Sequence, residues 1–359
     1  MTLQLRCCLH CALLAVLIAG LPQAATAGRL GSWDDKAGKF LPAVVEPDKS
    51  NSYLALDGGD QLFDFQLSQA LFVEKKTMIA NYAILRFAVD SCHAGGFIGD
   101  LAATDGKESS LANPKAVRPG IGVMTAASYN KCSIAGGSGK DAFSAFSKGF
   151  NFAVGAPHPD SDGWLDAYKI ASRTVQKAQM IIGGTLDDQA PQYWSSGDAL
   201  DGLTLKPDRD TQDFAFLVVA PGKDDAEQFW NDLFELHNIL TSDYGWKDAP
   251  GSKHELIVLY GDGTQPKFVK DKIDWIDARA TSGSLDMQLA RVHGKFTDSS
   301  QGFFYFASHG GARAVPEPTS IALLIAGLFM LIRNLGLMGR LRPYVHCTNI
   351  AYTEFKDSP

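Results

Sequence analysis

The stretch AILRFAVDSCHAGGF, residues 83–97, joins an apolar run to a turn that carries a thiol. Residues 83–89 are apolar apart from one arginine, which is typical of a strand buried on both faces of a sheet. The glycine pair at the end of the stretch predicts a turn directly after that strand. We therefore expect Cys92 at the carboxyl end of a buried strand.

A second run, GFFYFASHGG at residues 302–311, ends in the same way but carries His309 at its tip. An imidazole that removes the proton of a thiol is the usual means of making cysteine a nucleophile. His93 follows Cys92 directly, and consecutive residues at a strand end point apart, so we expect it to make a turn contact. The pair Cys92 and His309 therefore indicates a cysteine nucleophile and its base, provided that the two strand ends meet.

Apolar strands alternate with helical patterns along most of the chain, which favours an α/β fold with a doubly wound, mostly parallel sheet. Active sites of such sheets lie beyond the carboxyl ends of the strands. The expected strands are 83–89, 121–128, 214–220, 255–263 and 303–311. The expected helices are 64–75, 141–154, 164–180, 227–245 and 270–296. Residues 28–52 read as turn-rich, and 191–213 as a polar loop.

Composition limits the partners. The formal net charge of −7 over 359 residues gives no broad basic field, so nucleic acid is not an expected partner. Arg6, the apolar run at 8–21 and the small residues at 25–27 predict a secretory signal peptide over 1–27, with a short membrane anchor as the alternative. Only Cys92 and Cys132 then remain in the exported body before residue 312. In an oxidising compartment these two thiols also permit a disulfide.

The block DSCHAGGF (90–97) resembles the catalytic-cysteine block of the caspase–legumain clan of peptidases, closest to its metacaspase-like members. FFYFASHGG resembles the catalytic-histidine strand of that clan. The segments 123–128, 191–198, 229–240, 243–246 and 256–264 are also similar to blocks of the family. The resemblance covers most of 50–311 and implies a caspase-like α/β fold.

The order of the two blocks is reversed relative to the family, where the histidine comes first. Here a cysteine half (28–205) precedes a histidine half (213–311), and residues 52–71 resemble the segment that normally follows the histidine strand. This order predicts a circularly permuted peptidase domain over 28–311, with the usual ends joined near 205–213. Two separate half-domains or a degenerate duplicate are the alternative.

The resemblance implies a cysteine endopeptidase that uses a Cys92–His309 dyad and requires no cofactor. The backbone N–H groups of Gly310 and Cys92 would form its oxyanion hole. Asp90 and Asp232 match acidic residues that face the substrate pocket in the family, which implies cleavage after Arg or Lys. A structural strand-end bond for Asp90, a helix cap for Asp232 and a legumain-like preference for Asn stay open, as does an inactive surface or matrix binding protein.

Two further segments carry expectations. Asp160, Asp162 and Asp166 fall at positions 1, 3 and 7 of a calcium-loop count, but Gly163 comes too early and Ala171 replaces the final glutamate, so calcium is only weakly indicated. VPEPTS (315–320), an apolar run and Arg333 resemble a PEP-CTERM sorting signal over 312–342, followed by a tail at 343–359. That signal implies a Gram-negative bacterium, a transient membrane anchor cut by an exosortase-type enzyme, and a final place at the cell surface or outside. A plain single-pass anchor is the alternative.

Overall fold

The computed structural model describes residues 29–41, 50–136, 142–155, 163–181, 189–202, 204–222 and 226–314. All of these residues belong to one compact unit, which ends at Ala314.

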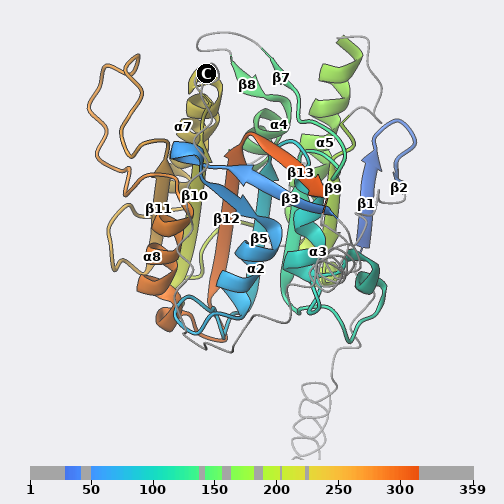
Figure 1. Ribbon diagram of the computed structural model, residues 1–359, viewed down its shortest axis with the longest axis horizontal. Coiled ribbons are helices and arrows are strands. Elements are labelled where there is room, and N and C mark those ends of the chain that lie inside the picture. The colour runs from blue at the N-terminus through green and yellow to red at the C-terminus, as the bar shows by residue number, and fades with distance from the viewer. Residues whose placement is uncertain are drawn as a thin grey trace, which may run out of the picture. The chain divides into compact units, whose positions relative to one another are not determined.

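The centre of this unit is an eight-stranded sheet with the order β11-β10-β12-β5-β6-β9-β1-β2 (Figure 1). Neighbouring strands from β11 to β6 all run parallel, whereas β9, β1 and β2 each pair antiparallel with the strand before them. The bounds are β11 (His254–Tyr260), β10 (Asp213–Ala220), β12 (Gln301–Ser308), β5 (Ile84–Asp90), β6 (Ile121–Thr125), β9 (Gln192–Ser195), β1 (Arg29–Asp34) and β2 (Lys39–Leu41). The expected α/β fold with a mostly parallel sheet is confirmed.

Helices pack on both faces of the sheet (Figure 1). One core contains side chains of α2, α3 and α8, and the other contains side chains of α4, α5 and α7. The bounds are α2 (Asp64–Phe72), α3 (Phe97–Ala102), α4 (Ala145–Val154), α5 (Trp164–Ile181), α6 (Asp198–Asp201), α7 (Ala226–Ser242) and α8 (Ser282–Val292). Strands of the cysteine half and of the histidine half thus share one sheet and the same two cores.

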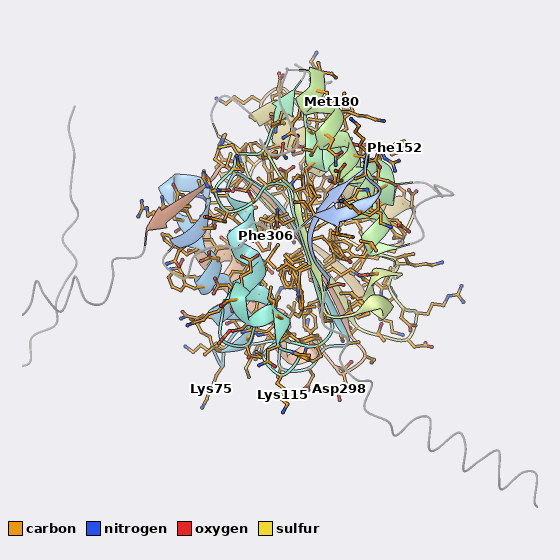
Figure 2. The ribbon with its side chains drawn as sticks, turned by 90° about the vertical axis from the view of Figure 1, so that its right-hand side faces the viewer. Lys75, Lys115, Phe152, Met180, Asp298 and Phe306 are labelled. Atoms are coloured by element: carbon orange, nitrogen blue, oxygen red, sulfur yellow. The ribbon has the colours of Figure 1, made fainter. Side chains whose placement is uncertain are left out.

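The central strands are mostly apolar because alternate side chains enter opposite cores. Along β12, Phe304 and Phe306 belong to the core of α2, α3 and α8, whereas Tyr305 belongs to the other core. The Phe304 ring stacks between Phe87 and Phe216, with ring centroids 4.9 Å from each. Figure 2 shows Phe306 in the interior, while charged side chains such as Lys75, Lys115 and Asp298 lie at the periphery.

Two smaller antiparallel sheets lie beside the main one. The first has the order β13-β3-β4, and the second pairs β7 with β8. Their bounds are β3 (Ser50–Ala55), β4 (Gln61–Phe63), β7 (Ala135–Gly136), β8 (Phe143–Ser144) and β13 (Gly310–Ala314). In the β13–β3 ladder Gly310 pairs with Leu54, and the last pair joins Ala314 to Ser50.

Three local expectations are wrong. Residues 192–195, expected in a polar loop, form the fully buried strand β9 between β6 and β1. Residues 29–41, expected as turns, add β1 and β2 to the sheet edge. The helix expected from residue 270 begins only at Ser282, with Thr281 as its N-cap.

The segment before α8 runs extended along the outer edge of β11. The N–H of Asp277 donates to the carbonyl of Val258, and the Asp277 carboxylate accepts the Val258 N–H at 2.7 Å. Trp275 stacks on the ring of His237, with centroids 4.0 Å apart. The apolar residues of this segment therefore cover an edge strand and α7, and their spacing resembled a helix only by coincidence.

Candidate active site

The strand ends that carry Cys92 and His309 are neighbours. β12 and β5 pair in parallel, with Ala307 opposite Asp90. His309 and Cys92 each follow this pair by two residues. Gly310 packs so closely against the same turn that a Cβ there would overlap the Ser91 hydroxyl and the Cys92 carbonyl.

The turn after β5 is held against the loop that follows β6. His93 has a left-handed backbone conformation (φ 61°), and its Nδ1 lies 2.6 Å from the Tyr129 carbonyl oxygen. Gly95 approaches the same loop so closely that a Cβ would lie 2.5 Å from the Tyr129 nitrogen. His93 thus makes a turn contact, as the sequence indicated.

A cleft of about 90 Å³ opens at this edge of the sheet. It is lined by the end of β5, the segment leading into β7, the first turn of α7 and the end of β12. The lining residues are Asp90, Ser91, Cys92, Ser133, Ile134, Ala135, Gln228, Phe229, Ser308 and His309. The cleft therefore contains both the thiol and the imidazole that the sequence singled out.

The His309 side chain is exposed and lies against α7. Its ring meets the edge of Phe229, with ring centroids 5.5 Å apart and an interplanar angle of 76°. Ala55 N–H donates to the His309 carbonyl at 2.7 Å, so the backbone at this position is fixed by β3. Sequence reasoning missed Phe229, because an aromatic residue in the first turn of an amphipathic helix resembles ordinary core.

The Cys92 thiol is half-buried, and burial is the main reason that its pKa is raised to about 12. A hydrogen bond with the Cys132 thiol and the negative charge of Asp90 raise the pKa further, while the Ser133 N–H lowers it. In this conformation the thiol is protonated at neutral pH. The sequence left a Cys92–Cys132 disulfide open, and in the structure both cysteines are free thiols.

Asp90 and Asp232 form a buried acidic pair beneath the cleft, with exposed fractions of 2% and 0%. Burial raises the pKa of both carboxyls, and the charge of Asp90 raises that of Asp232 further. Asp90 lines the cleft, but Asp232 does not. The structure therefore brings the two predicted substrate-binding carboxyls together and gives only one of them access to the cleft.

Hydroxyl groups surround this acidic pair. Ser133 Oγ donates to Asp90 at 2.8 Å, and Ser147 donates to it from both its hydroxyl and its N–H. The Tyr305 hydroxyl lies 2.6 Å from Ser147 Oγ. The signal available in the sequence was Tyr305 within the apolar run FFYF and Ser147 within AFSKGF, which sequence reasoning did not use.

The Asp232 carboxylate is hydrogen-bonded to the residue that directly precedes α4. Ser144 N–H donates to its Oδ2 at 3.0 Å, while Oδ1 has no hydrogen-bond partner among the described residues. The Asp232 carboxylate therefore accepts a hydrogen bond from the backbone at the start of α4, which packs against α7, and does not cap its own helix.

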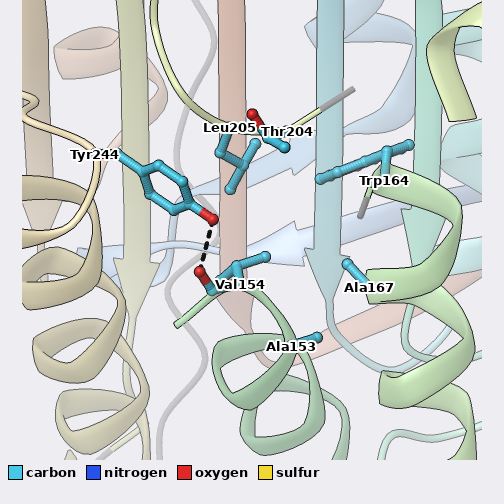
Figure 3. A pocket seen from close by; sticks show the side chains of 8 residues that line it. Ala153, Val154, Trp164, Ala167, Thr204, Leu205 and Tyr244 are labelled. Atoms are coloured by element: carbon cyan, nitrogen blue, oxygen red, sulfur yellow. Dashed lines mark hydrogen bonds between the residues drawn. The ribbon is translucent and has the colours of Figure 1, made fainter. Parts of the chain in front are cut away.

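Several expectations fall wholly or partly outside the described residues. These are the signal peptide at 1–27, the sorting segment beyond Ala314, the tail at 343–359, and Asp160 and Asp162 of the calcium count. Of the three aspartates in that count, the structure describes Asp166, which lies in the first turn of α5 and pairs with Lys169 at 3.1 Å. Trp164 and Ala167 of the same helix line a small apolar pocket, next to which Tyr244 OH donates to the Val154 carbonyl (Figure 3).

Among the residues that the structure describes, none of the helices is long and apolar enough to cross a membrane. The same residues contain no group of three or more His, Cys, Asp or Glu side chains placed to hold a metal ion.

No family model matches the chain, and neither the curated proteins nor the solved structures contain a protein that matches it.

Proposed function

We propose that this protein is a cysteine endopeptidase that hydrolyses peptide bonds with a Cys92–His309 dyad. The observation that carries the proposal is the shared cleft, which both side chains line from neighbouring strands. Two stretches more than two hundred residues apart in sequence supply the thiol and the base, as the chemistry requires.

The raised pKa of Cys92, about 12, decides how the thiol is activated. At pH 7 only about one thiol in 10⁵ would be ionised at that pKa, so a resting thiolate contributes little. His309 therefore accepts the thiol proton as the sulfur attacks the scissile carbonyl, rather than in advance. It returns that proton to the leaving amine and then activates the water that releases the acyl group.

The oxyanion of the tetrahedral intermediate is assigned to the backbone N–H groups of Gly310 and Cys92. The close packing of Gly310 on the Cys92 carbonyl supports this assignment, because it brings the two backbones together beside the thiol.

A circularly permuted caspase-like fold is part of the proposal. Counted from β10, the parallel strands have the order 2-1-3-4-5, which is a common order of doubly wound sheets. The β13–β3 ladder supports the position of the new ends. Its terminal pair, Ala314 and Ser50, has the geometry of a hairpin whose turn has been cut.

The proposed substrate is a peptide with Arg or Lys before the scissile bond, because Asp90 presents an acidic group to the cleft. Asn is the second candidate. Asn is favoured by the raised pKa of Asp90 and by the three hydrogen bonds that Ser133 and Ser147 donate to Asp90, because the Asn side chain binds through neutral hydrogen bonds.

The segments outside the described residues complete the proposal. Export by residues 1–27, transient anchoring through 312–342 and release by an exosortase-type enzyme would bring the peptidase to the cell surface or beyond. No cofactor is part of the mechanism. A catalytically inactive binding protein is the competing function, and the high pKa of Cys92 is the observation that favours it.

Active-site alkylation separates these functions. We expect the reduced protein to react with a peptidyl chloromethyl ketone at Cys92, identified by peptide mass, and to cleave a peptide substrate. Cys92→Ala and His309→Ala should each lower cleavage by about 10³-fold or more. His293→Ala is the matched histidine control, because His293 follows α8 and does not line the cleft, and it should retain cleavage. Reduced, folded protein that neither cleaves nor labels would contradict the proposal.

A panel of inhibitors with Arg, Lys, Asn or Asp at the first position then tests the pocket. Asp90→Asn should reduce the preference for Arg and Lys over Asn. An unchanged preference would remove Asp90 from substrate recognition.

A further inference from the structure

Cys132 lies in a loop that is bound to the Cys92 turn on both sides of each cysteine. His93 N–H donates to the Lys131 carbonyl at 2.7 Å, and Ser133 Oγ donates to Asp90 at 2.8 Å. The residues flanking Cys132 are thus hydrogen-bonded to residues flanking Cys92. The Cys132 thiol is near enough to raise the pKa of Cys92, and neither cysteine is in a disulfide.

The Cys132 loop is also fixed from the opposite side. Gln189 is fully buried, and its side chain accepts the Ile134 N–H at 3.0 Å and donates to the Ala126 carbonyl at 2.7 Å. These bonds hold both ends of the loop between β6 and β7. The position of the Cys132 loop beside the Cys92 turn is therefore built into the fold.

The two cysteines differ in access. Cys132 is exposed, whereas Cys92 is half-buried in the cleft. An oxidant from solution reaches Cys132 first, and Cys92 is the thiol that lies next to it. This is the arrangement of an accessible thiol with a resolving partner.

We propose that Cys92 and Cys132 form a reversible disulfide that withholds the nucleophile until the protein is reduced. This inference rests on the proposed peptidase function for its consequence, but the disulfide itself does not depend on catalysis.

The chemistry balances with a peroxide as oxidant. The Cys132 thiol takes one oxygen from hydrogen peroxide to give a sulfenic acid and one water. The Cys92 sulfur then displaces that oxygen as a second water and forms the S–S bond. Two thiols lose two electrons and two protons, and one peroxide becomes two waters. A dithiol reductant reverses the step by thiol–disulfide exchange.

Peptide mass mapping tests the disulfide without reference to activity. The reduced protein is treated with stoichiometric hydrogen peroxide, blocked with iodoacetamide, digested and analysed for a cross-linked peptide pair. We expect a Cys92–Cys132 link that dithiothreitol removes. Absence of the link, with both cysteines recovered as alkylated or as sulfinic acids, would overturn the proposal.

Alkylation of Cys92 gives the second readout. In oxidised wild-type protein the rate of Cys92 labelling should fall at least about tenfold, and dithiothreitol should restore it. In Cys132→Ser, the same oxidation should leave no reversible protection of Cys92. Reversible protection that persists in Cys132→Ser would also overturn the proposal, because the partner would then be another group.

These results are distinguishable from failure of the proposed function. A protein that forms the link but cleaves no peptide after reduction would contradict the peptidase and leave the disulfide standing. A protein that cleaves peptides after reduction but never forms the link would contradict only the disulfide.

Discussion

At the scale of single residues, the site combines an exposed histidine with two buried acids and a half-buried thiol. Asp90, Asp232 and Cys92 all have a raised pKa, and burial is the largest cause in each case. A buried carboxyl of this kind makes the folded state less stable as the pH rises, because ionisation is easier in the unfolded chain.

Asp232 gives the clearest test of this cost. Its folded pKa lies well above the unfolded value, so its penalty is absent below the unfolded pKa and grows as pH rises toward the folded pKa. Asp232→Asn keeps an oxygen to accept the Ser144 N–H and removes the charge. We therefore expect a higher melting temperature at pH 8 and a smaller difference between pH 5 and pH 8, measured by thermal unfolding.

Glu227→Gln, at an exposed position of the same helix, is the matched control for charge removal, because Glu227 is not among the charges that raise the pKa of Asp232. Asp232→Asn should also change the preference among inhibitors less than Asp90→Asn does, because Asp232 does not line the cleft. A melting temperature that falls at pH 8 would show that the carboxylate of Asp232 is stabilising.

The residues of the site differ in how far the sequence predicted them. Cys92 and His309 were predictable because each ends a buried run, and parallel strand ends lie at one edge of a sheet. The Cys132 contact was not, since it depends on Gln189 and on Gly95, whose partners lie far away in sequence. The burial of Asp232 was not predictable either, because the helical spacing of 227–245 does not say which helix covers its face.

At the scale of elements, the approach of β13 to the end of β5 depends on Gly310. A Cβ at this position would overlap Ser91 and Cys92, so Gly310→Ala has to push the His309 strand end away from the thiol. We expect this substitution to destabilise the fold by about 1–3 kcal/mol. It should also slow alkylation of Cys92 by the peptidyl inhibitor, measured alongside thermal unfolding.

Gly283→Ala is the matched control, because a Cβ at Gly283 meets nothing within 4 Å and the residue lies in the first turn of α8. It should leave labelling unchanged. Equal labelling by both variants would show that the strand ends need not be so close.

The elements that sequence reasoning placed correctly are those with long, uniform patterns. β10, β11 and β12 lie close to their expected bounds, since six to eight consecutive buried residues are typical of a central strand. β9 has only four residues between Pro191 and a glycine, and its burial comes from strands on either side. Such a short antiparallel strand has no pattern of its own.

At the scale of the whole molecule, the order of the two halves can be tested by rearranging the chain. The two places that allow this are the Ala314–Ser50 pair and the irregular segment between α6 and β10. If the first pair marks a cut hairpin, a two-residue Asn-Gly turn can join the two residues. The chain can then be opened between Arg209 and Asp210, which are both exposed in the irregular segment before β10. The rearranged chain would run from Asp210 to Ala314, through the turn, and from Ser50 to Arg209.

We expect this rearranged protein to keep the fold, because every strand pair among β3–β13 is retained and termini in exposed segments tolerate such changes. The control is the chain of residues 50–314 in its natural order, because it lacks β1 and β2 just as the rearranged chain does. We expect the two proteins to have melting temperatures within a few degrees of each other, similar circular dichroism and equal Cys92 labelling. A control that folds beside a rearranged chain that does not would show that the two ends are not a divided hairpin, and would remove the main structural support for a permuted order of the two halves.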